Sequence, residues 1–393
     1  MATHIKNSLS RSSHRSSGKT GAFAAMLIVV LASAMLLCAA GCNPKAAWSD
    51  TGGDQVGVKS VVTCFVYDPT HDILYAGTEG EGLWRCTKAS TSPHWSYAGN
   101  RLFDTVVSLA YDPARSILYV SGGVKDTVSS DYKGGVWRSK NPGTSPNWVD
   151  THSPSAFVDM AYDRSQNTLY AAAAGVWRCS RPDSAASWSD AGGELKSVGI
   201  DSLIYDNASH TLFAGTTGVL WASTLDADLH WHNITTTLNS PEDFSGTSAS
   251  ALAYDSKRDV LYVGTPGTGV RRCANPRGAR VWTSIERILI SRNGPNAVSS
   301  LGLDPVRDIL YMGGYEAGGL LGPHPPGGVW RCVKPDTAAT WSSTGGPLDG
   351  SLIGPIAYDI GRGVLFTTGD IRGVEDGQGV WRYEPPAPGK PGR

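Results

Sequence analysis

Three polar insertions interrupt an otherwise regular sequence and contain the side chains best suited to chemistry. They lie at residues 125–133, 315–324 and 370–376. Each combines carboxylates with basic or aromatic side chains, a mixture that suits protein or glycan recognition. We predict that they form a ligand-binding face, and the alternative for each residue is a solvated surface role. The candidates are Lys125, Asp126, Asp131, Tyr132, Lys133, Tyr315, Glu316, His324, Asp370, Arg372, Glu375 and Asp376.

Two carboxylates of the third insertion, Asp370 and Asp376, are suited either to acid and base catalysis or to holding calcium. Their spacing within one loop does not decide between these hypotheses, and no catalytic residue is assigned. The sequence has no Cys-x-x-Cys-His and no Cys/His cluster with zinc spacing. We therefore expect no resident metal and no cofactor.

The insertions are positioned by a repeat that surrounds them. The repeat occurs seven times, with some substitutions, and consists of four short motifs in a fixed order. They are an apolar run that ends in Asp, a Leu-Tyr pair, a Gly-Val-Trp-Arg segment and a lone Trp. A repeat length of 43 to 55 residues suits one four-stranded propeller blade per repeat. The sequence thus predicts an all-β, seven-bladed β-propeller. The Asp residues that close the first run are Asp68, Asp112, Asp163, Asp206, Asp255, Asp304 and Asp359.

All 13 tryptophans fit this frame. Blade five has Arg271 where the other blades have a third-strand Trp. The third-strand residues are Trp84, Trp137, Trp177, Trp221, Trp330 and Trp381. The fourth-strand residues are Trp48, Trp95, Trp148, Trp188, Trp231, Trp282 and Trp341.

Ring closure is indicated by the two ends of the repeat region. Residues 47–53 closely match the fourth strand of blade three, whereas blade seven stops after its third strand. We predict 3+1 closure, in which the N-terminal strand around Trp48 completes blade seven and removes exposed sheet edges. The propeller then covers residues 47–383, and we expect the Pro-rich tail of residues 384–393 to be disordered.

The first 41 residues predict a lipoprotein signal peptide. Basic residues precede an apolar run at 22–37, which is too short to span a membrane. The run leads into Ala40-Gly41-Cys42, which resembles a bacterial lipobox and predicts lipidation of Cys42. An ordinary signal peptide, cleaved near Ala40, is the alternative interpretation.

A lipidated tether of residues 42–46 would join this anchor to the propeller. Asn43 follows the lipid site where Asp would favour inner-membrane retention. The sequence therefore predicts an exported, lipid-anchored protein of the bacterial envelope, at the outer membrane or the cell surface.

The loop lengths divide the propeller into two unlike faces. The first and second strands are joined by a turn of constant length, since Asp and Leu are six residues apart in every blade. The link between the third and fourth strands is nearly constant as well. The two other links differ widely in length, and alternate loops emerge on opposite faces. One face is therefore constant and the other, the variable face, carries all three insertions. Such a scaffold suits the display of a binding surface, with neutral drift as the alternative.

Four cysteines, Cys86, Cys179, Cys273 and Cys332, share one position in the third strands of different blades. Equivalent positions in different blades lie too far apart for a disulfide. We predict that these are small buried strand residues.

Two segments before fourth-strand tryptophans, Asp183–Trp188 and Asp336–Trp341, resemble the Asp-box hairpins of BNR-repeat propellers. Both keep the Asp five residues before the Trp and lack the Gly. Over residues 47–383 the chain is similar in architecture to sortilin-like, photosystem assembly factor-like and xyloglucanase-like propellers, which implies no single function. It lacks the six-bladed pattern and Arg-Ile-Pro motif of bacterial sialidases and the paired propellers of xyloglucanases.

These observations favour a non-catalytic binding or assembly scaffold for a protein or polysaccharide of the envelope. The net charge of −1 gives no indication of a nucleic-acid partner. We expect a monomer that meets the membrane only through its lipid. The alternatives are a glycan-active hydrolase or lyase that uses variable-face carboxylates, and a structural surface-layer component. An enzyme requires two or more carboxylates at the channel mouth, whereas a binding protein requires an apolar patch with scattered charge.

Overall fold

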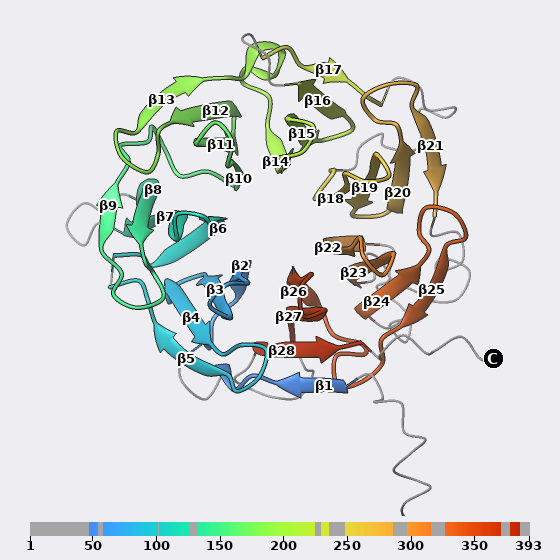
Figure 1. The fold of residues 1–393 in the computed structure, drawn as a ribbon, viewed down its shortest axis with the longest axis horizontal. Coiled ribbons are helices and arrows are strands. Elements are labelled where there is room, and N and C mark those ends of the chain that lie inside the picture. The colour runs from blue at the N-terminus through green and yellow to red at the C-terminus, as the bar shows by residue number, and fades with distance from the viewer. Residues whose placement is uncertain are drawn as a thin grey trace, which may run out of the picture. The chain divides into compact units, whose positions relative to one another are not determined.

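The computed structural model describes residues 47–53, 58–100, 102–125, 132–224, 229–235, 248–285, 297–315, 327–370 and 378–385. They form seven four-stranded antiparallel sheets, arranged as the blades of a ring around a central channel (Figure 1). Helix is almost absent from these residues, and one short 3-10 helix spans Gly193–Leu195. The predicted seven-bladed β-propeller is confirmed.

Blades one to six each run outward in chain order from an inner strand beside the channel to an outer strand at the circumference. Blade one comprises β2 (Val62–Asp68), β3 (Ile73–Thr78), β4 (Leu83–Thr87) and β5 (His94–Tyr97), and blade two comprises β6 (Thr105–Asp112), β7 (Ile117–Lys125), β8 (Tyr132–Lys140) and β9 (Trp148–Asp150). Blade three comprises β10 (Asp159–Asp163), β11 (Thr168–Ala173), β12 (Gly175–Ser180) and β13 (Ser187–Asp190). Blade four comprises β14 (Ile200–Asp206), β15 (Thr211–Thr216), β16 (Leu220–Thr224) and β17 (His232–Asn233).

Blades five and six follow the same order. They comprise β18 (Ala251–Asp255), β19 (Val260–Thr265), β20 (Gly269–Ala274) and β21 (Val281–Ser284), then β22 (Ala297–Asp304), β23 (Ile309–Tyr315), β24 (Gly328–Val333) and β25 (Thr340–Ser343).

Blade seven takes its strands from both ends of the propeller. It comprises β26 (Ile353–Asp359), β27 (Val364–Asp370), β28 (Gln378–Glu384) and β1 (Ala47–Asp50). Trp48 pairs with Tyr383, the same register that joins Trp95 to Cys86 in blade one. The predicted 3+1 closure is therefore confirmed, and β28 continues one residue beyond the expected boundary at 383.

The hydrophobic core is divided among the seven interfaces between neighbouring blades. Seven clusters of buried side chains occur among the described residues, one for each interface. Between blades one and two, for example, Tyr75 packs against Tyr111 with ring centroids 6.1 Å apart. Every residue of β3, β15 and β19 is buried, because second strands lie within these interfaces.

The four equivalent cysteines lie in this core as predicted. Cys86, Cys179, Cys273 and Cys332 are free and fully buried. Burial raises the pKa of each thiol to about 12. They therefore remain protonated at neutral pH, and thiolate chemistry is not expected of them.

The fourth-strand tryptophans join each blade to the one before it. The indole Nε1 donates to the residue that follows the outer strand of the preceding blade. Among the described residues, Trp48 Nε1 of the ring-closing strand has no such acceptor. The donor and acceptor pairs are Trp95 to Thr51 Oγ1 (3.1 Å) and, to main-chain carbonyls, Trp148 to Ala98 (3.1 Å), Trp188 to Thr151 (3.2 Å), Trp231 to Ala191 (3.1 Å), Trp282 to Ile234 (3.0 Å) and Trp341 to Ile285 (2.6 Å).

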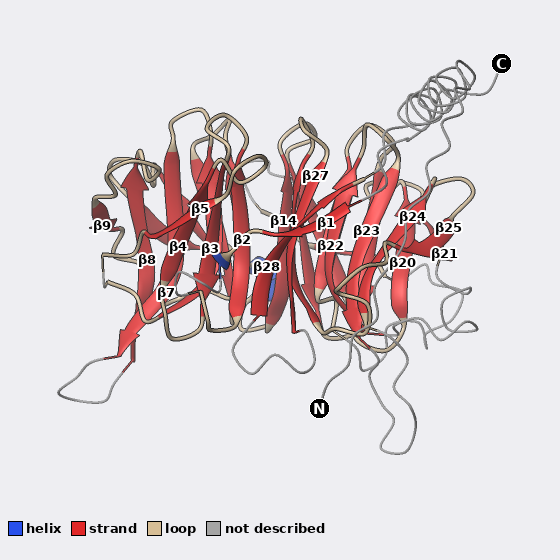
Figure 2. Cartoon of the chain, turned by 90° about the horizontal axis from the view of Figure 1, so that it is seen from below, coloured by secondary structure: helices blue, strands red, loops and turns tan. Residues whose placement is uncertain are grey.

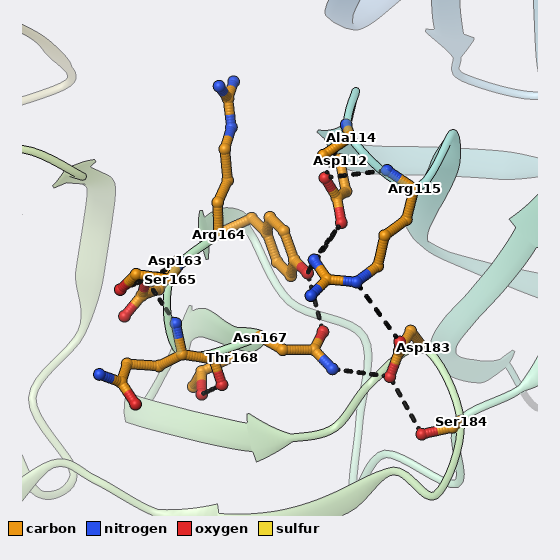
Figure 3. Close-up of polar contacts among 12 residues, drawn as sticks. Asp112, Ala114, Arg115, Asp163, Arg164, Ser165, Asn167, Thr168, Asp183 and Ser184 are labelled. Atoms are coloured by element: carbon orange, nitrogen blue, oxygen red, sulfur yellow. Dashed lines mark hydrogen bonds and ion pairs between the residues drawn. The ribbon is translucent and has the colours of Figure 1, made fainter.

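On the constant face, the repeated Asp caps a turn and also reaches the next blade. Asp112 Oδ1 accepts from Ala114 N (3.0 Å), and its Oδ2 accepts from Arg115 (2.9 Å) and from Tyr162 Oη of blade three (3.0 Å). Arg115 also approaches Asp183 of blade three, at 3.7 Å (Figure 3). The repeated Asp therefore caps its turn and also binds the next blade. Both Asp-box-like aspartates take part in interblade contacts, since Asp336 of blade six accepts from Arg272 Nε of blade five (2.9 Å).

Replacing Trp188 with Phe is expected to lower the free energy of unfolding by about 1 kcal/mol more than Trp48→Phe, because only Trp188 loses a hydrogen bond. Both side chains are half-buried on outer strands, so the costs of the lost volume should be similar. Urea unfolding measures this difference in unfolding free energy, provided that the dependence of the free energy on urea concentration is the same for both variants. Equal losses would show that these indole hydrogen bonds add nothing measurable to the contact between blades.

Candidate functional site at the channel mouth

The inner strands bring their first residues together at the variable-face end of the channel. Each inner strand follows the link from the preceding blade, so it enters on the variable face and leaves at the constant face (Figures 1 and 2). A cavity of about 450 Å³ lies among these first residues. It is lined by Val62, Thr63, Asp159, Ser202, Leu203, Ile204, Ser250, Ala251, Leu252, Ser299, Ser300, Leu301, Gly354, Pro355 and Ile356.

Hydroxyl groups around this cavity bridge neighbouring inner strands. The pairing of inner and second strands is irregular near the mouth in blades one, two, four, six and seven. The hydroxyls there donate to main-chain carbonyls of the next blade, so their protons are occupied and their oxygens remain available as acceptors. The pairs are Thr63 to Val106 (2.5 Å), Ser202 to Ala249 (2.5 Å), Ser250 to Val298 (3.1 Å), Ser299 to Ile353 (2.7 Å) and Ser300 to Gly354 (2.8 Å).

Asp159 of blade three is the one charged residue in the cavity lining. Its Oδ1 accepts from Met160 N (2.8 Å) and Ser108 Oγ (3.3 Å), and its Oδ2 accepts from Leu203 N (2.8 Å). The carboxyl borders the cavity and is partly exposed there, but the ring encloses it on every other side. This burial raises the pKa of Asp159 to about 6 although the three hydrogen bonds oppose the change.

Most of the buried carboxylates on the constant face have an ion-pair partner, which Asp159 lacks. Five of the seven repeated aspartates there have a basic side chain three residues later as an ion-pair partner. No Lys or Arg of the described residues forms an ion pair with Asp159. Among the described residues, Asp163 and Asp206 of the constant face likewise lack such a pair, and Asp159 differs from them in that its carboxyl borders the channel cavity. The five pairs are Asp68 with His71, Asp112 with Arg115, Asp255 with Arg258, Asp304 with Arg307 and Asp359 with Arg362.

Exposed aliphatic side chains stand at the same end of the inner strands. Val61 precedes β2, Val158 precedes β10 and Leu352 precedes β26. Their exposed fractions are 47%, 49% and 54%. We call these three residues the apolar rim. They belong to blades one, three and seven, so they supply separate apolar side chains around the single charge, and a binding surface at this end stays a prediction.

Most of the predicted binding residues lie outside the described part of the chain. This holds for Asp126, Asp131, Glu316, His324, Arg372, Glu375 and Asp376, and for the lipidation residue Cys42.

The remaining predicted residues lie near strand ends on the variable face, and a role for them in ligand binding stays a prediction. Lys125 and Tyr132 are paired at the ends of β7 and β8, which extend beyond their neighbours (Figure 2). Tyr315 ends β23, and Asp370 ends β27. Blade one, which has no insertion, separates blade two from blade seven.

Lys133 lies beside a groove of about 620 Å³ at the base of the blade-two insertion. Trp137, Asp150 and Ser153 line the same groove. The Ser153 hydroxyl accepts from Val136 N (2.8 Å), and Asp150 Oδ1 accepts from His152 N (2.7 Å). Both polar side chains thus stabilise the local backbone.

The described residues supply one carboxylate to the cavity lining, whereas the hydrolase hypothesis requires at least two. No group of three or more His, Cys, Asp or Glu suited to a metal occurs in this part of the chain. Likewise, no helix within the described ranges is long and apolar enough to cross a membrane.

Sequence reasoning did not single out Asp159. The signal was present in the alignment of the repeats, since the equivalent inner-strand residues are uncharged. They are Cys64, Ser108, Ser202, Ala251, Ser300 and Pro355. A lone carboxylate at a position that is otherwise small and uncharged marks a departure from the structural repeat.

Comparison with known proteins identifies the fold and no family. No protein-family model and no curated protein matches the sequence. A chain of the mitotic checkpoint complex has a TM-score of 0.56 at 10% identity, over 86% of this chain and 90% of that chain. The Cps50 (Swd1) β-propeller domain of Myceliophteria thermophila has a TM-score of 0.56 at 12% identity, over 82% and 96%.

A bacterial structure is also similar. The extracellular domain of a putative one-component system from B. thetaiotaomicron has a TM-score of 0.58 at 16% identity. The match covers 87% of this chain and 40% of that longer chain. At such identities the likeness supports the propeller fold alone.

Asp159→Asn is expected to stabilise the protein more at about pH 8 than at about pH 4. The folded-state pKa lies above the ordinary value, so ionisation disfavours the folded state, and the penalty grows as pH rises to about 6. The difference in unfolding free energy between the two pH values should be on the order of 1–3 kcal/mol. Asp190→Asn, an exposed change on an outer strand, is the control. A variant effect of the same size at both pH values would contradict the shifted pKa.

Proposed function

We propose that this chain is a lipid-anchored propeller of the bacterial envelope that binds a protein or polysaccharide through its variable face. The carrying observation is the contrast between the two faces. On the constant face, every described turn between first and second strands has the same length and an Asp that caps it. On the variable face, the links differ in length and the channel opens between an apolar rim and a single carboxylate. A rigid ring that varies on one face only is suited to recognition.

Binding is favoured over catalysis by the composition of the channel mouth. Glycoside hydrolysis ordinarily needs two carboxyl groups on either side of the scissile bond. Asp159 is the one carboxylate in the described lining, and its neighbours are hydroxyls bonded to the next blade. The apolar rim adds surface that a bound partner would cover.

A glycan-active hydrolase or lyase is the second candidate. It is favoured by one specific observation, the pKa of about 6 at Asp159, which suits a general acid near neutral pH. The second carboxylate would come from an insertion, for example Asp370 or Asp376. Turnover of envelope polysaccharide that is lost in Asp159→Asn would favour this candidate.

The envelope location rests on the leader and on Cys42. The similar fold of a bacterial extracellular domain is consistent with an exported propeller. We expect a monomer without nucleic-acid partners, held at the outer membrane or cell surface by lipid alone.

The lipid anchor is tested by replacing Cys42 with Ser in the full chain. We expect the wild type to incorporate labelled fatty acid and to fractionate with membranes, and the variant to do neither, because the acylated cysteine would be absent. Equal membrane association of both proteins would contradict lipidation at Cys42.

Trimming the insertions of blades two, six and seven to the length found in blade three is expected to weaken partner binding at least about tenfold. The binding assay uses the chain from residue 43, without the lipid site, against fractionated envelope protein and polysaccharide. The control replaces the exposed Val306 and Ile360 of the constant face with Ser.

The control variant should bind like the wild type. Binding that survives loop trimming, or that is lost in the constant-face control, would contradict recognition by the variable face.

A further inference from the structure

We propose that the channel mouth receives the ammonium or guanidinium group of a lysine or arginine side chain from a protein partner. This inference rests on the proposed binding function and specifies the chemistry of the partner. Four features of the mouth support it: its acceptor oxygens, its unpaired carboxylate, its dimensions and its apolar rim.

The polar atoms of the mouth are acceptors. Thr63, Ser202, Ser250 and Ser299 each donate their proton to a carbonyl of the next blade, at 2.5 to 3.1 Å. A hydroxyl that has donated its proton offers only lone pairs to a ligand. The ligand must therefore bring the hydrogens, and ammonium and guanidinium groups are donors without acceptors.

The mouth also holds an uncompensated negative charge. Three groups of the protein donate to Asp159, namely Ser108 Oγ, Met160 N and Leu203 N, and all three are neutral. Most buried aspartates of the constant face have a cationic partner from their own turn. A cationic ligand group would give Asp159 a charge-assisted hydrogen bond, which no side chain of the described residues provides.

Other titratable groups at this end of the inner strands do not compensate the charge. Cys64 of β2 is neutral, since burial raises the pKa of its thiol to about 12. Asp201 of β14 is exposed and adds a second negative charge at the same end of the ring. Among the described inner-strand residues near the mouth there is no basic side chain, so the local field favours a cation.

The dimensions favour a side chain over a metal ion. The cavity of about 450 Å³ falls within the range of small-molecule pockets, which is about 300–1,000 Å³. Calcium prefers several carboxylates at short range, and the described residues hold no such cluster. The apolar rim of Val61, Val158 and Leu352 would contact the aliphatic neighbours of an inserted basic residue, which favours a protein partner over a free amine.

The inference is tested with two capped pentapeptides, Ala-Leu-Arg-Leu-Ala and the same peptide with citrulline, the neutral isostere of Arg. The chain from residue 43 is titrated by calorimetry at low salt and about pH 7.5. We expect the Arg peptide to bind saturably and at least about tenfold more tightly than the citrulline peptide. In Asp159→Asn the two peptides should bind within about twofold of each other, while the control Asp190→Asn keeps the wild-type preference.

A second measurement does not depend on how well the variant folds. Lowering the pH to about 5 protonates Asp159 in the wild type, so its preference for Arg over citrulline should fall at least about fivefold. Free arginine methyl ester should bind more weakly than the peptide, because it makes no contact with the apolar rim.

Three results would overturn the inference. They are the absence of saturable Arg-peptide binding up to about 10 mM, a wild-type preference for Arg that persists at about pH 5, and an undiminished preference in folded Asp159→Asn. An envelope partner that is captured equally by wild type and Asp159→Asn, but lost on loop trimming, would overturn the channel assignment while the proposed binding function stands.

Discussion

The pairing of β1 with β28 is the constraint on which the rest of the structure depends. Without β1, blade seven would have three strands, and β28 would expose an unpaired edge. With β1 in place, both ends of the propeller lie in one sheet, and all seven interfaces are formed at once. Because the hydrophobic core is divided among those interfaces, closure fixes the core, the channel and the two faces together.

Hydrogen bonds join neighbouring blades at three places in the ring: the outer strands, the channel mouth and the constant face. Outer-strand indoles donate to the preceding blade, hydroxyls near the channel donate to the following blade, and the repeated Asp of the constant face accepts from a tyrosine of the next blade in at least three cases. Residues that occur in most blades thus have structural partners in most blades. A functional residue is better sought where one blade departs from the others, and Asp159 is such a departure.

The sequence was sufficient to predict the ring because the positions of Trp, Leu and the repeated Asp are tied to strand pairing. The match between residues 47–53 and blade three likewise reveals closure. The channel mouth could not be predicted in the same way. Irregular pairing near the start of several inner strands decides which side chain borders the channel, and simple alternation does not encode it. Asp159 precedes the Met-Ala-Tyr-Asp run by which blade three was recognised, so it reads as a loop residue. The insertions stay predictions, since most of their residues lie outside the described structure.

Asp304 of the constant face and Asp159 of the channel mouth have opposite effects on the stability of the folded protein. Asp304 is held by Arg307 and Tyr358, and although burial acts to raise its pKa, these bonds lower that pKa below its ordinary value. Asp159 has only neutral hydrogen-bond donors, so the effect of burial is larger than theirs and raises its pKa. The first arrangement stabilises the folded protein above the ordinary Asp pKa, and the second destabilises it there. The ring tolerates this cost, because hydrogen bonds from Ser108 Oγ, Met160 N and Leu203 N, which belong to three different blades, hold the carboxylate in place. An unpaired charge that is held in place in this way is preorganised for a ligand of opposite charge, since the free energy of desolvating it has already been spent on folding.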